Sequence, residues 1–253
     1  MTRIDLNADL GESFGRYQLP GEDELLGLVT SANIACGFHA GDPLVMQRMV
    51  GAAAARRVTI GAHPGYRDLV GFGRRELGAA PSELAADVLY QVGALDAFCR
   101  AAGTRLRYIK LHGALYHRAA RDREVAKSIA YGLRQLDSDL VVLGPEGSAL
   151  LLAAAETGLD VAREAFVDRA YQPDGQLVPR SEPGALLEDI DLIAERALRM
   201  VQDHFVVAID GTRCIVRADS LCVHGDGPQA LAIVRAVRQR FEAEGITLAP
   251  FVK

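Results

Sequence analysis

Four of the six histidines fall at the ends of predicted strands or in the turns just after them: His39, His63, His112 and His224. An imidazole can exchange a proton near neutral pH or donate a lone pair to a divalent cation. A single histidine in such a turn is usually only hydrogen-bonded to a backbone carbonyl. Four histidines in the same structural position indicate a shared rim, where the side chains could act together.

Carboxylates and an amide alternate with apolar residues in the first predicted strand, residues 3–9. Successive side chains of a strand point to opposite faces, so Asp5, Asn7 and Asp9 share one face. We expect Asn7 and Asp9 at the mouth of the fold and Asp5 deeper inside. Glu12 follows directly after this strand and would join the same mouth.

Lys110 and His112 lie two residues apart at the end of the predicted strand 107–111, and therefore on one face. A buried lysine beside a carboxylate such as Asp9 or Glu164 is what a catalytic proton relay looks like. A structural ion pair has the same sequence pattern, so both interpretations stay open.

Two kinds of chemistry fit this group of residue types. In the first, an aspartate and two histidines bind a divalent ion with an open coordination position, and the ion activates water while another carboxylate acts as base. In the second, no metal takes part. Aspartate, lysine and histidine then transfer protons directly, and the polar ring orients a small polar substrate.

The elements that must position these residues alternate between strand and helix. Residues 33–43 read N-I-A-C-G-F-H-A-G-D-P, which predicts a buried strand, a glycine break that carries His39, and a helix start. Asp42 is the expected N-cap of that helix, and Pro43 suits its first position. Functional groups on the loop after a strand are typical of α/β enzymes.

About seven strands of parallel type, each followed by a helix, predict a single domain over residues 1–253, a distorted (β/α) barrel. The predicted strands are 3–9, 34–36, 58–62, 107–111, 140–143, 161–166 and 221–223, and a small hairpin is expected at 205–216. The predicted helices are 23–28, 44–56, 82–102, 122–136, 148–157, 183–201 and 228–244. A doubly wound open sheet is the alternative, but it would concentrate functional residues at one switch point, and no strand turn shows G-x-G-x-x-G.

Composition excludes several classes of function. The net charge of -5 is mild and no basic run occurs, so nucleic acid is not an expected partner. No apolar run reaches the ~18 residues of a membrane helix, and the chain enters a strand by Ile4 without a signal peptide, so we expect a cytoplasmic protein. Four widely spaced cysteines predict buried free thiols.

A loop rich in glycine and arginine follows the third predicted strand at residues 66–78, with Arg67, Arg74 and Arg75. It could be a lid with anion-binding arginines or a solvated surface loop. The chain contains no G-x-x-x-x-G-K-[ST] and no G-x-S-x-G. We therefore expect no ordinary nucleotide site and no serine-hydrolase elbow.

Five long motifs resemble the LamB/YcsF family, and the resemblance covers essentially the whole chain. They are D-L-N-A-D-L-G-E (5–12), N-I-A-C-G-F-H-A-G-D-P (33–43), G-A-H-P-G-Y-R-D (61–68), K-L-H-G-A-L-Y (110–116) and V-D-R-A-Y (167–171). The resemblance implies a distorted seven-stranded (β/α) barrel similar to glycoside hydrolases and deacetylases.

Members of this family act as the A subunit of an ATP-dependent 5-oxoprolinase. The resemblance thus implies the reaction of 5-oxo-L-proline with ATP and two waters to give L-glutamate, ADP and phosphate. It also implies B and C partner subunits similar to allophanate hydrolase, with ATP as co-substrate of the complex. The absence of a phosphate-binding loop from this chain agrees with a nucleotide step that needs the other subunits.

The resemblance also suggests roles for individual residues. Deacetylase relatives use an Asp-His-His metal site, so Asp9, His39 and His63 are candidates for a divalent metal, with His224 as a further ligand. For the reaction itself, Asp9, Lys110 and Asp5 are the expected catalytic residues: a carboxylate deprotonates water, and Lys110 stabilises the oxyanion or protonates the leaving nitrogen. The expected substrate-binding residues are Asn7, Glu12, His112, Glu164, Arg169 and Arg67. One of Arg67, Arg74 and Arg169 is expected to hold the substrate carboxylate.

Two competing functions belong to other classes. One is a metal-dependent deacetylase of small molecules or carbohydrates, which would act without ATP. The other is a non-catalytic subunit whose polar residues stabilise a complex.

Overall fold

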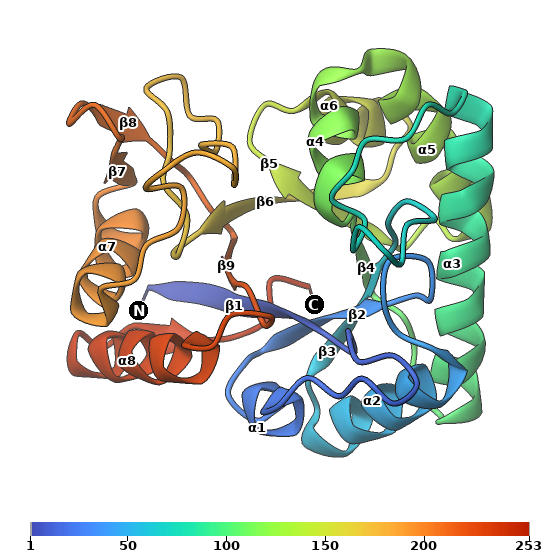
Figure 1. The fold of residues 1–253 in the computed structure, drawn as a ribbon, viewed down its shortest axis with the longest axis horizontal. Helices are drawn as coiled ribbons and strands as arrows, with labels where there is room; N and C mark the ends of the chain where they lie inside the picture. Colours follow the sequence, from blue (N-terminus) through green and yellow to red (C-terminus); the bar gives the residue numbers. More distant parts are fainter. Residues whose placement is uncertain (1, 253) are drawn as a thin grey trace.

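A computed structural model describes residues 2–252. The barrel strands are β1 (Arg3–Leu10), β2 (Ser31–Ala35), β3 (Thr59–His63), β4 (Tyr108–Lys110), β5 (Val141–Pro145), β6 (Asp160–Phe166) and β9 (Ser220–Val223). They are all parallel and pair in this order, and β9 pairs back with β1, which closes the barrel (Figure 1). The predicted seven-stranded (β/α) barrel is confirmed, and the open sheet is wrong.

Helices surround the barrel (Figure 1). They are α1 (Glu22–Leu26), α2 (Pro43–Arg56), α3 (Pro81–Ala101), α4 (Gly113–Arg121), α5 (Arg123–Leu136), α6 (Ala149–Glu156), α7 (Ile190–Gln202) and α8 (Ala230–Ala243). The predicted cap of α2 is confirmed, because the Asp42 carboxylate accepts hydrogen bonds from the backbone N–H groups of Leu44 and Val45. An N-cap of this kind stabilises a helix by about 1 kcal/mol.

Some local expectations were wrong. The helix predicted from residue 183 begins at Ile190, where the Asp189 carboxylate accepts a hydrogen bond from the N–H of Leu192. The residues before it instead form an antiparallel bridge between Leu186 and Arg169. Helix α4 and the short strand β10 (Thr247–Leu248), which pairs with β1, were not predicted. The hairpin of β7 (Phe205–Val207) and β8 (Arg213–Ile215) is confirmed.

The two ends of the barrel differ in chemistry. At the lower end, where the strands begin, Tyr108 is fully buried and Phe251 packs against it with ring centroids 5.1 Å apart. Gly61 makes room for this tyrosine, since a Cβ there would lie 2.2 Å from the Tyr108 ring. The C-terminal residues therefore close the lower end with apolar groups, and the polar side chains gather at the other end, where the strands finish.

All four cysteines are buried free thiols, as the sequence predicts. None of the helices within residues 2–252 combines the length and the apolar character that crossing a bilayer requires.

Asp5 lies inside the barrel among hydroxyl groups. Its Oδ1 accepts hydrogen bonds from Thr30 and Ser31, each at 2.6 Å, and its Oδ2 accepts one from Ser220. Ser220 in turn accepts a hydrogen bond from Asn7 Nδ2 at 2.6 Å. Asp5 therefore occupies the deep position that the strand pattern indicated, at the base of the polar network.

Burial raises the pKa of Asp5 from 3.8 to about 6. A carboxyl whose pKa is raised by folding contributes stability fully below pH 3.8, and this contribution is lost as the pH rises through 6. The shift corresponds to roughly 3 kcal/mol. We expect Asp5→Asn, which stays neutral, to gain stability relative to the wild type between pH 4 and pH 7, as measured by urea unfolding. Asp139→Asn, at an exposed aspartate, is the control, and equal pH profiles for Asp5→Asn and the wild type would contradict the expectation.

Candidate active site

Lys110 is the centre of the polar end of the barrel. Its Nζ lies 2.8 Å from Asp9 Oδ1 and 2.9 Å from Glu164 Oε1, and it contacts Cys222 Sγ at 3.0 Å and Asn7 Oδ1 at 3.5 Å. Each of these five side chains is buried. They come from four strands of the barrel, β1, β4, β6 and β9. The structure thus brings together Asp9, Lys110, Asn7 and Glu164, four of the residues predicted from sequence.

The Asp9–Lys110 pair is held in its charged form. Burial opposes both charges, but His63 and Lys110 outweigh it and hold the pKa of Asp9 well below its usual range. In the same way Asp9, Cys222 and Glu164 outweigh the burial of Lys110 and hold its pKa well above the usual range. Asn33 Nδ2 also donates to Asp9 Oδ1 at 2.8 Å. Asp9 is therefore a fixed negative charge whose Oδ1 is already engaged by Lys110 and Asn33.

Glu164 has more free hydrogen-bonding capacity. One oxygen forms the ion pair with Lys110, but among residues 2–252 neither carboxylate oxygen has a partner in good hydrogen-bond geometry. Burial and then this carboxylate raise the pKa of the neighbouring Tyr116 phenol well above its usual range. A buried carboxylate with an unused oxygen is able to accept a proton or a hydrogen bond from a ligand.

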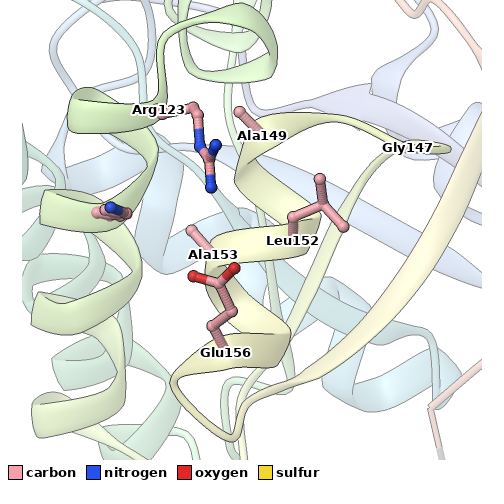
Figure 2. Close-up of a pocket in the computed structure, with 7 residues that line it drawn as sticks. Arg123, Gly147, Ala149, Leu152, Ala153 and Glu156 are labelled. Atoms are coloured by element: carbon pink, nitrogen blue, oxygen red, sulfur yellow. The ribbon is translucent and has the colours of Figure 1, made fainter.

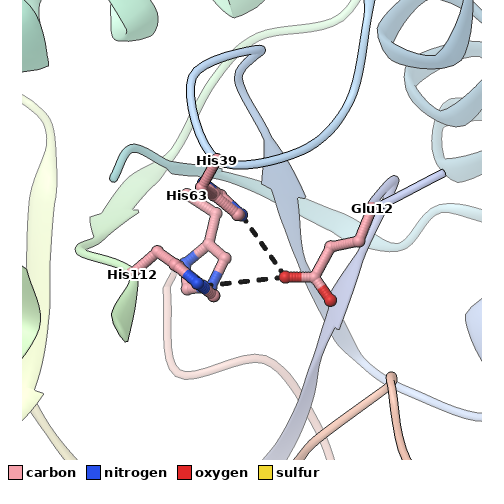
Figure 3. A group of neighbouring side chains, drawn as sticks. All are labelled: Glu12, His39, His63 and His112. Atoms are coloured by element: carbon pink, nitrogen blue, oxygen red, sulfur yellow. Dashed lines mark hydrogen bonds and ion pairs between the residues drawn. The ribbon is translucent and has the colours of Figure 1, made fainter. Parts of the chain in front are cut away.

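A second group lies beside the first and consists of Glu12, His39, His63 and His112 (Figure 3). Glu12 Oε1 lies 3.3 Å from His39 Nε2 and 3.6 Å from His112 Nδ1. His112 Nδ1 lies 3.0 Å from His63 Nε2, which is itself 3.4 Å from Asp9 Oδ1. One ligand atom from each of the four residues lies within 4.8 Å of the others, so together they could hold a metal ion.

Burial sets the protonation of this second group. Burial and the neighbouring histidines lower the pKa of His39 and of His112 well below the usual range, so both imidazoles are neutral. Burial and Asp9 raise the pKa of Glu12 well above its usual range. Neutral imidazoles with available lone pairs are the form of histidine that binds metal ions.

The glycine-rich loop after β3 covers the histidines. The Phe72 carbonyl accepts a hydrogen bond from His112 Nε2 at 2.7 Å, and Phe72 adopts a left-handed backbone with φ of 53°. A Cβ on Gly73 would approach both His39 and His112 to 2.8 Å. Of the two interpretations of this loop, the structure supports a cover over the site, and the strained Phe72 marks a position where local geometry is constrained.

Arg74 extends this cover across the mouth of the barrel. Its guanidinium packs over the Phe72 ring at 4.9 Å and pairs with Asp226, which follows β9. Arg180 Nη1 lies 4.0 Å from the same Asp226 carboxylate. The central residues of both groups are themselves buried.

His224 lies outside the group that could hold a metal. Its Nδ1 lies 2.9 Å from Asp168 Oδ2, and its ring stacks on Phe166 with centroids 5.2 Å apart. Of the three histidines expected as metal ligands, the structure brings together His39 and His63, and His112 takes the position expected for His224.

Two of the three arginines predicted to hold the substrate carboxylate, Arg67 and Arg169, have other partners. Arg67 pairs with Asp87 on the surface, with a side chain 66% exposed. Arg169 is buried and donates to the backbone carbonyls of Val178 and Ala185. Burial, together with the nearby Arg180, lowers its pKa to about 10. The structure therefore places neither guanidinium in contact with the Lys110 or histidine groups.

Known proteins are similar to this chain over nearly its full length. The model of the LamB/YcsF family matches residues 4–253. The chain belongs to the LamB/YcsF family. Proteins named as the A subunit of 5-oxoprolinase, from Streptomyces avermitilis and Pyrococcus abyssi, are 53% and 50% identical to it over 248 residues, which is 98% of this chain and 99% and 97% of theirs. The crystal structure of lactam utilization protein from Thermus thermophilus has a TM-score of 0.92 and 48% identity, covering 98% of this chain and 99% of that one.

The sequence motifs of this LamB/YcsF chain contain site residues that sequence reasoning did not select. Asn33 opens the second family motif and pairs in register with Asp9 on β1. It donates to both Asn7 and Asp9 and accepts from the Tyr108 hydroxyl at 2.6 Å. The signal that could have identified it is a polar amide within a strand that is otherwise mainly apolar and fully buried.

A surface pocket of the LamB/YcsF chain lies away from this chemistry. It has a volume of about 260 Å³ and lies between α5 and α6, lined by residues such as Arg123, Lys127 and Glu156 (Figure 2). Its side chains come from the outer helical layer and include none of the buried strand-end residues. The candidate active site is therefore the closed mouth of the barrel.

Proposed function

We propose that this chain is the A subunit of an ATP-dependent 5-oxoprolinase. With B and C subunits, it hydrolyses the lactam of 5-oxo-L-proline to L-glutamate, and ATP is the co-substrate of the complex in the cytoplasm. The observation that carries this proposal is the full-length identity of about half of all residues to proteins named as the A subunit of 5-oxoprolinase. The name of the Thermus thermophilus relative, a lactam utilization protein, supports the same substrate class.

The geometry supports a hydrolytic role for the Lys110 group. In the proposed reaction ATP, supplied through the complex, phosphorylates the lactam oxygen and leaves as ADP. The activated carbon lies against Lys110, whose ammonium stabilises the negative charge on its oxygens as water adds. Glu164 takes a proton from the attacking water and returns it to the ring nitrogen as the carbon–nitrogen bond breaks. This step gives the free amine and a carboxyl phosphate, and a second water releases phosphate to leave glutamate.

Asp9 has a supporting role in this scheme. It was expected to deprotonate water, but its Oδ1 already accepts hydrogen bonds from Lys110 and Asn33. We assign it to keeping Lys110 charged and fixed in position, because a fixed charge needs no reorganisation during the reaction. Glu164, the neighbouring carboxylate, is better placed as the base.

We assign recognition of the substrate carboxylate to Arg74. This guanidinium lies at the mouth and already binds one carboxylate, that of Asp226. A substrate carboxylate could exchange with Asp226, which would couple substrate entry to opening of the bridge.

The decisive experiment reconstitutes the chain with B and C subunits and measures glutamate and ADP from 5-oxoproline. We expect both products only when all three subunits and ATP are present. Glutamate release without this chain would contradict the proposal. ATP-independent cleavage of an acetylated substrate by the chain alone would favour the deacetylase instead.

A further inference from the structure

His63 at the end of β3 and His112 just after β4 face each other through ring nitrogens. His63 Nδ1 lies 2.8 Å from the Lys110 carbonyl, and His112 Nε2 lies 2.7 Å from the Phe72 carbonyl. A carbonyl can only accept, so each of these nitrogens carries a proton. In rings that carry only that proton, the opposite nitrogens, His63 Nε2 and His112 Nδ1, present their lone pairs to each other at 3.0 Å.

Two lone pairs at this distance repel unless a proton or a metal cation lies between them. A metal cation would also need at least one further ligand. Glu12 supplies that ligand, since its Oε1 is 3.6 Å from His112 Nδ1. Ligand atoms around a tetrahedral ion with bonds of 2.0–2.1 Å lie about 3.3 Å from one another. The measured separations of 3.0 and 3.6 Å bracket this value. Both rings also donate their other N–H to a backbone carbonyl, as metal-bound histidines usually do.

We propose that His63 Nε2, His112 Nδ1 and Glu12 form a three-ligand site for a first-row divalent cation such as Zn²⁺, Mn²⁺ or Fe²⁺. Two imidazoles and one carboxylate suit these ions better than Mg²⁺ or Ca²⁺, which prefer oxygen ligands. Three protein ligands leave a position open for water or substrate. The nearest further carboxylate is Asp9, whose Oδ1 is 3.4 Å from His63 Nε2.

His39 is a positioning residue of this site and not a ligand. Its ring is stacked on His112, with centroids 3.7 Å apart and planes within 4° of parallel. An imidazole donates its lone pair in the plane of the ring, so one ion cannot lie in the planes of both stacked rings. His39 Nε2 instead lies 3.3 Å from Glu12 Oε1 and orients that carboxylate.

Asp9 contacts both His63 of this site and Lys110 of the neighbouring group. A bound cation would therefore act as a Lewis acid on the same substrate carbonyl. That consequence rests on the proposed function. The binding of the cation itself does not, because it can be measured on the isolated chain without B, C or ATP.

The experiment strips the purified full-length chain with a chelator and titrates it with Zn²⁺ and Mn²⁺ by calorimetry, with thermal unfolding as a second readout. We expect one equivalent to bind and the unfolding midpoint to rise. His63→Asn and His112→Asn should lose this equivalent. Glu12→Gln should lose it too, and it preserves side-chain size in case a histidine variant does not fold.

His39→Asn separates positioning from ligation. It should still bind one equivalent, with affinity lowered roughly 10- to 100-fold, the usual effect of changing a residue that orients a ligand. His204→Asn, at an exposed turn between α7 and β7, is the matched control and should bind as the wild type does. No binding by the wild type, or unchanged binding by the folded His63, His112 and Glu12 variants, would overturn the site. If His39→Asn no longer binds the cation, the assignment of His63, His112 and Glu12 as the only three ligands is overturned.

Discussion

Lys110→Met should strongly lower the rate of 5-oxoproline hydrolysis by the reconstituted complex. Methionine keeps much of the length of the side chain but removes the positive charge that lies between Asp9 and Glu164 at contact distance. In the proposed reaction it removes the group that stabilises the oxyanion, and the loss of one such donor lowers kcat by roughly 10²- to 10³-fold. Turnover is measured as glutamate formed with B, C and ATP in excess.

The same substitution should also destabilise the fold, because it leaves two buried carboxylates facing each other. Breaking a buried ion pair in this way costs about 3–5 kcal/mol. The triple variant Asp9→Asn, Lys110→Met and Glu164→Gln removes both unpaired charges and should recover most of this stability in urea unfolding. It should remain inactive, which separates lost chemistry from lost folding.

Lys127→Met is the matched control. Lys127 is a half-exposed lysine of α5 that pairs with Glu124 at 4.0 Å. The control should leave both turnover and stability near the wild-type values. Full activity of a folded Lys110→Met variant would instead favour the non-catalytic subunit, in which the polar residues serve assembly.

Glu164→Gln should lower kcat by roughly 10²- to 10⁴-fold, the usual contribution of a general base, with a smaller change in KM. Glutamine keeps the shape of the side chain but cannot take a proton from water. Lys110 retains its contact with Asp9, so we expect the free energy of unfolding to change much less than in Lys110→Met. Steady-state kinetics of the complex and urea unfolding of the chain give the two quantities.

Glu156→Gln provides the comparison, because Glu156 is an exposed residue of α6 that lines the surface pocket. A Glu164→Gln variant with wild-type kcat would remove Glu164 from the reaction. If Asp9→Asn then lost activity with its stability intact, the role of base would return to Asp9, as its position in the first motif first suggested.

The fold was largely predictable from the sequence, for a local physical reason. Several strands are short, mainly apolar runs that end at a glycine or a polar residue, and several of the following helices begin at a side-chain cap, as at Asp42. These signals depend on neighbours within a few residues. The start of α7 was missed because residues 183–189 are held by contacts with the distant Arg169 segment, which a local pattern cannot contain.

The sequence by itself determined which residue types gather at the mouth. Strand alternation put Asn7 and Asp9 on one face, and the breaks after the strands carried His39, His63 and His112. Only the tertiary structure decided which of them touch. Pairing across the closed barrel sets Lys110 against Asp9 and Glu164 and places His112, not His224, beside His63. Those distances depend on the register between strands, and on a loop that folds back over the site, and neither can be read from the spacing of residues along one chain.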